Sequence, residues 1–265
     1  LMLGGIDISA GANMYLSAVV AAKLMEAYAA ANGASGVMPY VIGIGAGLLC
    51  GALVGIINGV FIVKLKMVPF IMTLAMTNVL TGIGQVITKA ALQPVRTSGF
   101  QPSSVKLGPV SMIVIIALLF AALFHFLLKY TVYGRHLTAQ GNNNEAARKL
   151  GIHTERNALI AYTICGAMAG LGGILSAGQV GAISSNFASG NEFDIIPAAV
   201  LGGISLFGGK GSVLPGALIG IVLVNTITNG LTMMAANPYV YTIVRGVIIF
   251  IAVMLDSINY KGELR

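Results

Sequence analysis

The stretch AQGNNNEAARKLGI, residues 139–152, lies inside a polar window, residues 129–157, of a chain that is otherwise largely apolar. Long runs of apolar residues precede and follow this window, so it separates two groups of candidate membrane segments. The basic side chains of the window are Lys129, Arg135, His136, Arg148, Lys149, His153 and Arg156. We expect the window to lie in water and the rest of the chain to be organised around it.

A short helix is predicted inside the polar window. Asn143 or Asn144 can cap its N-terminus, and Gly151 can end it. Glu145 and Lys149 are four residues apart, which allows an ion pair along one helix face. Because so short a helix is marginal alone, its apolar stripe needs a partner, either in the same chain or in another protein. The stripe consists of Ala146, Ala147 and Leu150.

The composition predicts an all-α membrane protein, a polytopic helical bundle. Of the 265 residues 57% are hydrophobic and only 9% are charged, and the mean hydropathy is +0.90. Apolar runs of 18 or more residues can cross about 30 Å of hydrocarbon. We expect about eight transmembrane helices, at residues 10–31, 37–63, 69–90, 108–128, 157–180, 194–207, 213–234 and 239–255. Residues 194–207 make only about 21 Å of helix, so this segment is expected to be short or broken.

The net charge of +7 does not indicate nucleic acid binding, because the basic residues fall between apolar runs. Alternate crossings place one basic group on a single side of the membrane: Lys64, Lys66, the polar window, Lys210, Lys261 and Arg265. The opposite side receives Lys89, Arg96 and Lys106. The positive-inside rule therefore predicts a cytoplasmic polar window and a cytoplasmic tail.

Glycines recur every fourth residue in the second span, at Gly43, Gly47, Gly51, Gly55 and Gly59. Small residues at this spacing indicate close helix packing within the membrane. The later run GGKG, residues 208–211, is superficially like a phosphate loop, but glycine stands where the Ser or Thr is required. We therefore reject nucleotide binding by this chain.

Two charge pairs are predicted near the ends of spans. Lys23 and Glu26 share a helix face, where a structural pair is favoured over an intramembrane functional site. Arg245 is costly within a helix, and we expect a structural pair with Glu192 or Asp194.

Neutral polar residues form stripes in two spans, and such stripes are costly where they face lipid. They predict either a translocation path or ordinary interhelical hydrogen bonds. The first stripe is Thr73, Thr77, Asn78, Thr81 and Gln85, and the second is Asn225, Thr226, Thr228 and Asn229. Residues 4–11 resemble 202–209, and 51–56 resemble 216–221. In the predicted topology these similarities indicate an inverted repeat, which is typical of transporters.

Neither a catalytic group nor a metal or cofactor site is predicted. The eight carboxylates are scattered, and Cys50 and Cys165 lie in apolar runs without metal-ligand spacing. An intramembrane enzyme is a minor alternative. An ion-coupled secondary transporter is another, and its candidate intramembrane charges are Asp7, Glu26, Asp194 and Arg245. A transporter driven by a soluble motor fits better, because the polar window has the form of a docking element.

Residues 141–152 resemble the cytoplasmic coupling segment of the permease subunits of ribose/galactose-type ABC sugar importers, in the branched-chain-type permease superfamily. The resemblance continues in order through residues 4–11, 190–194, 200–213 and 237–256. The departures are small: Asn142 stands where Gly is more usual, Asn144 where Pro is common and Pro197 where Ala is usual. The family has about two further N-terminal spans, so we expect a longer natural chain.

The resemblance implies one permease domain, residues 1–265, with the window at 129–157 as its cytoplasmic coupling loop. It implies a multi-pass protein of the bacterial inner membrane that pairs with a second copy. An ATP-binding subunit would dock underneath, and a soluble binding protein outside would deliver a monosaccharide. The coupling contact falls on Asn143, Glu145, Ala146, Ala147, Arg148 and Gly151. The alternative for Glu145 and Arg148 is a solvated loop helix. The sequence does not indicate which sugar is carried, or whether the ligand is a sugar at all.

Overall fold

The structure, a computed structural model, describes residues 1–263, with side chains at 1–237 and 239–258. Arg265 of the predicted tail lies outside the described residues, as does the side chain of Lys261. The chain forms two compact units, each assembled from separate segments. Unit 1 contains Leu1–Ile6, Leu119–Asn157 and Gly190–Arg265, and unit 2 contains Asp7–Leu118 and Ala158–Ser189. The prediction of a single permease domain stays a prediction.

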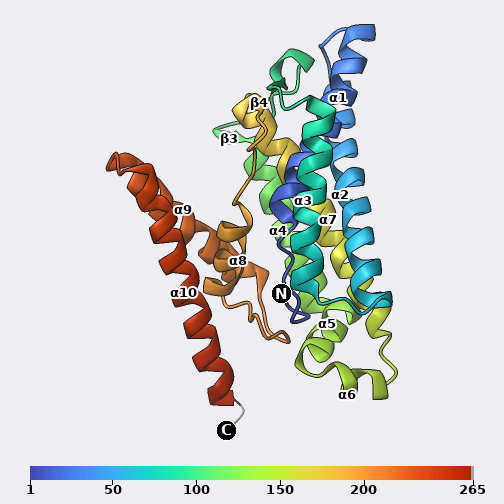
Figure 1. Cartoon of the computed structure of the whole chain (residues 1–265), viewed down its shortest axis with the longest axis vertical. Helices are drawn as coiled ribbons and strands as arrows, with labels where there is room; N and C mark the ends of the chain where they lie inside the picture. Colours follow the sequence, from blue (N-terminus) through green and yellow to red (C-terminus); the bar gives the residue numbers. More distant parts are fainter. Residues whose placement is uncertain (264–265) are drawn as a thin grey trace. The chain divides into compact units, whose positions relative to one another are not determined.

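The described elements are mainly helices (Figure 1). The first part of the chain forms α1 (Ala10–Asn32), α2 (Met38–Lys64), α3 (Pro69–Thr88), β1 (Gln93–Pro94), η1 (Arg96–Ser98), β2 (Lys106–Leu107), β3 (Val110–Ser111) and α4 (Met112–Tyr130). The second part forms α5 (Val132–Asn142), α6 (Asn144–Lys149), α7 (Thr154–Val180), β4 (Ala182–Ile183), α8 (Glu192–Leu201), η2 (Val213–Ala217), α9 (Leu218–Met233) and α10 (Pro238–Glu263).

Within residues 1–263, seven helices are long and apolar enough to cross a membrane. Their positions agree closely with seven of the predicted spans, and the polytopic all-α class is confirmed. The segment at 194–207 differs, because its helix α8 has only 10 residues and ends at Leu201. Ten residues make about 15 Å of helix, half the thickness of the hydrocarbon. This segment is a short helix followed by a loop and is not a continuous span.

Helix α1 is the centre of unit 2, and Figure 1 shows α2, α3 and α7 running along it. Its side chains are buried through most of its length, including Ala18, Val19, Ala21 and Met25 at 0% exposure. One buried apolar cluster joins α1, α2 and α3. Its members are Ala12, Leu16, Val54, Met72, Met76 and Leu80. Burial of this apolar surface is compatible with the predicted tight bundle.

The glycine ridge of α2 packs against α7, as its spacing predicts. A Cβ atom at Gly51 would meet the Gly166 carbonyl oxygen, and one at Gly55 would meet the Tyr162 carbonyl oxygen. Asn13 of α1 binds both helices at this contact. Its Nδ2 donates to the Gly51 carbonyl of α2 over 3.4 Å and to the Gly166 carbonyl of α7 over 3.2 Å. The helix backbones therefore approach each other directly, and an added methyl group has no room.

Unit 2 also contains two short antiparallel strand pairs. Strands β1 and β4 are antiparallel with Gln93 opposite Ile183, and β2 and β3 form a hairpin. Near β1, Gln93 Nε2 donates to Glu26 Oε2 over 3.0 Å. The same oxygen accepts from Lys23 Nζ at 2.9 Å, so the predicted pair between Lys23 and Glu26 forms. Both side chains are about half exposed, which favours the structural role.

In unit 1, α8 packs against α9 and α10, and the chain between α8 and α9 is irregular. Helix α8 ends where a Cβ atom at Gly202 would meet the Gly216 carbonyl at 2.5 Å. The π-helical turn η2 contains Leu214 at φ −118° and ψ 125°, outside the helical region. The Leu214 N–H donates to His125 Nδ1 of α4 over 3.3 Å. The expectation of broken helices is met here, whereas the inverted repeat stays a prediction.

Candidate functional site

The polar window contains two short helices, α5 and α6, of which its sequence predicted only the second. Helix α5 begins after Thr131, whose Oγ1 accepts from the Gly134 N–H over 3.3 Å. Leu137 is buried on one face of α5. The signal for this helix was a Thr N-cap directly after an apolar span. It was overlooked because the window contains so few apolar residues.

Helix α6 has the cap that its sequence predicts. Asn143 Oδ1 accepts from the Ala146 N–H over 2.9 Å, which selects Asn143 over Asn144 as the N-cap. Beyond α6, Gly151 has φ +81°, a left-handed conformation that glycine adopts without strain. Glu145 Oε1 lies 4.0 Å from Lys149 Nζ, and both side chains are more than three-quarters exposed. This pair adds little stability.

The apolar stripe of α6 is divided between the chain itself and the exterior. Ala147 is 2% exposed and packs within unit 1. Leu150 is 79% exposed, and Ala146 and Arg148 are exposed beside it. Of the two expected kinds of partner, the chain itself covers the stripe only at Ala147. The remainder is an exposed face with apolar and charged groups, suited to contact with another protein.

Two hydrogen bonds tie α5 to the chain that follows α6. Tyr133 Oη donates to the Asn157 carbonyl over 3.2 Å, and Gln140 Nε2 donates to the Thr154 carbonyl over 3.1 Å. Burial raises the pKa of Tyr133 to about 12, so its hydroxyl stays protonated and remains a donor. These bonds hold α5 against residues 154–157, so the segments before and after α6 are joined to each other.

The end of α5 meets a turn far away in the sequence. Residues 205–210 form this turn, which follows α8 and is called the 205–210 turn below. Its Ser205 N–H donates to the Lys210 carbonyl over 3.2 Å. A Cβ atom at Gly141 would meet the Met2 carbonyl oxygen and the Gly209 nitrogen. Gly209 N itself donates to the Met2 carbonyl over 2.9 Å. Three backbone segments of unit 1 therefore touch where side chains have no room.

Asp256 of α10 holds the other side of the 205–210 turn. Its Oδ2 accepts from the Leu206 N–H over 2.7 Å and from Ser205 Oγ over 3.3 Å. Hydrogen bonds to a carboxylate are stronger than those between neutral groups. The family resemblance includes Asp256, but no local pattern assigns it a role, because its hydrogen-bond partners lie about fifty positions earlier in the chain.

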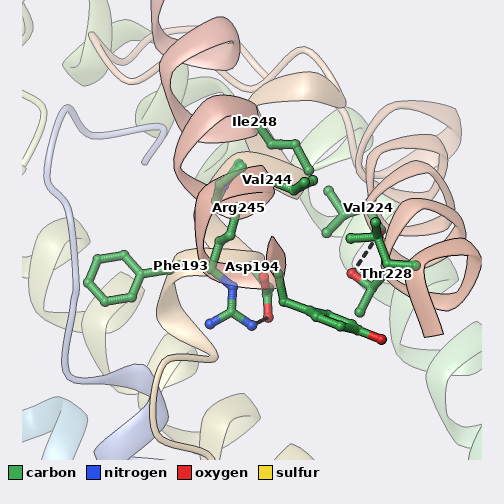
Figure 2. Close-up of a pocket in the computed structure, with 10 residues that line it drawn as sticks. Phe193, Asp194, Val224, Thr228, Val244, Arg245 and Ile248 are labelled. Carbon is green, nitrogen blue, oxygen red and sulfur yellow. Dashed lines mark hydrogen bonds and ion pairs between the residues drawn. The ribbon is translucent and has the colours of Figure 1, made fainter. Parts of the chain in front are cut away.

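The predicted structural charge pair forms between Arg245 and Asp194, and Figure 2 shows the guanidinium group directed at the carboxylate. Arg245 Nη2 lies 2.6 Å from Asp194 Oδ2, and Nη1 donates to the Gly190 carbonyl over 3.4 Å. Glu192, the other predicted partner, is buried at the start of α8. Burial raises the pKa of the Asp194 carboxyl, while the adjacent guanidinium opposes this rise.

A small cavity adjoins this pair (Figure 2). Its lining includes Thr228 of α9 and Tyr241 and Ile248 of α10. The cavity volume is about 20 Å³, which accommodates roughly one water molecule. A monosaccharide does not fit here in the conformation described.

The two predicted polar stripes lie on α3 in unit 2 and α9 in unit 1. On α3, Thr73 is buried and accepts from the Ile8 N–H over 3.1 Å, and Thr77 Oγ1 donates to the Ile8 carbonyl over 3.4 Å. These two residues make the alternative, structural type of bond. Several others bond the carbonyl four residues earlier in their own helix: Asn78, Thr81, Asn225, Thr226 and Thr228. Gln85 is half-buried and Asn229 exposed, and the path itself stays a prediction.

Comparison with known protein families gives a match over nearly the whole chain. Residues 1–253 match the family described as "Branched-chain amino acid transport system / permease component". The match includes the polar window, the 205–210 turn and the pair between Arg245 and Asp194.

Individual relatives are similar to this chain over almost all of its length. The galactose/methyl galactoside import permease protein MglC of Escherichia coli K12 is 36% identical over 98% of this chain and 80% of its own length. The D-allose transport system permease protein AlsC of the same strain is 34% identical, over 98% of this chain and 78% of its own length. The ribose import permease protein RbsC of Escherichia coli K12 is 32% identical, over 97% of this chain and 78% of its own length. No solved structure matches.

Proposed function

This chain belongs to the family of branched-chain-type transport system permease components, and from that membership we propose that it is the membrane-spanning subunit of an ATP-driven importer of monosaccharides. The observation that carries the proposal is the match of residues 1–253 to a permease family, together with sugar permeases as relatives. Seven apolar helices support a multi-pass protein of the bacterial inner membrane.

The energy source is a separate ATP-binding subunit that docks on the polar window. Support comes from the geometry of α6, which is capped by Asn143, supported through the buried Ala147 and exposed at Leu150. A motor that closes on ATP must push on a rigid element. A short helix whose one face is anchored and whose other face is open satisfies this need. This chain itself then has no catalytic role and no cofactor.

The other partners are a soluble sugar-binding protein outside the membrane and a second copy of this chain. The polar stripes suit a sugar as the cargo, because neutral amides and hydroxyls can pass its hydroxyl groups along without a deep charged trap. The path would include Asn78 of α3 and Asn225 and Asn229 of α9. Galactose, ribose and allose, the sugars named for the relatives, are the first ligands to test.

The proposal is tested with the full chain, the ATPase and the binding protein of one importer, reconstituted together in proteoliposomes. We expect ATP-dependent accumulation of at least one radiolabelled sugar, and ATP hydrolysis that rises when the loaded binding protein is added. Uptake driven by an ion gradient without the ATPase would instead establish a secondary transporter. ATP-dependent uptake of a non-sugar, with all three sugars excluded, would keep the importer and replace the substrate.

A further inference from the structure

The 205–210 turn is closed by hydrogen bonds between its own residues. Ser205 N–H donates to the Lys210 carbonyl, and Phe207 N–H donates to Ser205 Oγ over 3.2 Å. Ser205, Gly208 and Gly209 are buried. A turn closed by its own hydrogen bonds and packed on both sides transmits a displacement better than an open loop.

One side of this turn is seated on the end of α5. Gly208 and Gly209 have φ +92° and +74°, so the turn passes α5 in a conformation that glycine adopts readily. A Cβ atom at Gly208 would lie 2.9 Å from the Gly141 carbonyl oxygen. At Gly208 the turn meets the backbone of α5, and at Gly209 a Cβ atom would meet the side chain of Asn142, the last residue of α5. The turn and the end of α5 are therefore in close contact at two successive residues.

The other side of the turn is held by α10 through Asp256. The Leu206 N–H donates to the carboxylate over 2.7 Å, in a charge-assisted bond. Earlier in the same helix, Arg245 pairs with Asp194 of α8. Helix α10 thus contacts the turn at one place and the α8 segment at another, and both contacts are made through charges.

We propose that Asp256 is a positioning residue for energy coupling: its carboxylate fastens the 205–210 turn to α10, so that displacement of the polar window moves α10 and α8. The inference rests on the proposed function, in which an ATPase pushes on α6. It adds the route by which that push leaves the polar window within unit 1. Without the Asp256 contact, the ATPase still docks and hydrolyses ATP, but the movement is lost at the turn.

The test uses the reconstituted importer with the full chain carrying Asp256→Ala or Asp256→Asn. Ser257→Ala is the matched control, because it changes the neighbouring residue of α10. Three quantities are measured for each: co-purification of the ATPase, ATP hydrolysis, and sugar uptake per ATP hydrolysed. We expect Asp256→Ala to keep the ATPase and to lower uptake per ATP by about tenfold, the scale of one lost charge-assisted bond. Asp256→Asn retains an acceptor oxygen, so it recovers part of the loss.

Unchanged uptake per ATP in Asp256→Ala would overturn the proposal. So would a loss of uptake and hydrolysis in equal proportion, because that pattern indicates a purely structural role. If Asp256→Ala does not reach the membrane, Asp256→Asn decides, and full coupling in that variant counts against Asp256. Failure of the proposed function is distinguishable, because then the unmodified chain itself neither retains the ATPase nor transports a sugar.

Discussion

Arg245 Nη2 lies 2.6 Å from Asp194 Oδ2, and this ion pair joins α10 to α8. Helix α8 has only 10 residues and is too short to span the membrane. The two side chains are 36% and 33% exposed. The carboxylate is therefore partly removed from water, and the guanidinium compensates for that loss. The pair ties the first turn of α8 to α10.

Arg245→Ala is expected to destabilise the protein more than the pair itself contributes, because it leaves Asp194 partly buried without its cation. A double-mutant cycle with Asp194→Ala should give a coupling energy of about 1 kcal/mol, reduced by the exposure of both groups. Thermal unfolding of the detergent-purified protein measures it. Strictly additive effects of the two substitutions would show that the ion pair has no energetic role.

Docking on the polar window is tested at Leu150, which is 79% exposed on the open side of α6. Leu150→Asp should leave the fold intact and remove the ATPase during co-purification, because a charge replaces an apolar contact. Leu107→Asp is the matched control, since Leu107 is 75% exposed on the hairpin of β2 and β3 in the other unit. If both variants retain the ATPase equally, the docking surface lies elsewhere.

Much of this arrangement follows from local sequence. Hydropathy located seven spans, because each helix satisfies its own backbone within one apolar run. The four-residue spacing of Gly47, Gly51 and Gly55 identified a packing ridge. The sequence narrowed the α6 cap to Asn143 or Asn144, and the hydrogen bond to the Ala146 N–H selects Asn143. The pairing of Arg245 was anticipated because a membrane charge needs a partner.

The remaining features depend on contacts between distant residues. Helix α8 ends at Leu201, and a Cβ atom at the next residue, Gly202, would meet the carbonyl of Gly216, a relationship with no local signature. Likewise, the contact between Gly141 and Gly209 and the bond from Leu206 to Asp256 join segments separated by 50 or more positions. Glycines and one late aspartate look unremarkable in the sequence until the fold brings them together.

The α6 cap is expected to have a measurable energy. Asn143→Ala removes the acceptor for the Ala146 N–H and should destabilise α6 by about 1 kcal/mol. Asn143→Ser keeps a capping oxygen and should restore most of that amount. Hydrogen exchange of the α6 amides is the direct readout. Asn144→Ala is the control because Asn144 is the first residue of the helix, and faster exchange in it alone would mean that Asn143 is not the cap.

The glycine ridge offers a comparison within one helix. Gly51→Ala places a methyl group against the Gly166 carbonyl, and overpacking of this kind costs about 1–3 kcal/mol. No described atom lies within 4 Å of a Cβ atom built at Gly45, also in α2. Gly45→Ala should therefore be neutral or stabilising by about 0.5–1 kcal/mol through helix propensity. Equal thermal stability of the two variants would contradict the observed packing of α2 on α7.

The last prediction separates a translocation path from helix packing in the polar stripes. Asn78 and Asn229 are exposed in unit 2 and unit 1 respectively, whereas Thr73 is fully buried and accepts from Ile8 N–H over 3.1 Å. Asn78→Ala and Asn229→Ala should lower sugar uptake severalfold with little change in stability, because each removes a hydrogen-bonding group offered to the solute.

Thr73→Val should do the reverse. It removes the buried acceptor for the Ile8 N–H, so it should lower the free energy of unfolding by about 1–3 kcal/mol and leave uptake per folded molecule unchanged. Uptake in proteoliposomes and thermal unfolding are measured on the same preparations of all three variants. If the two asparagine variants transport at the rate of the unmodified chain, the sugar follows another route, and the stripes serve only the packing of α3 and α9.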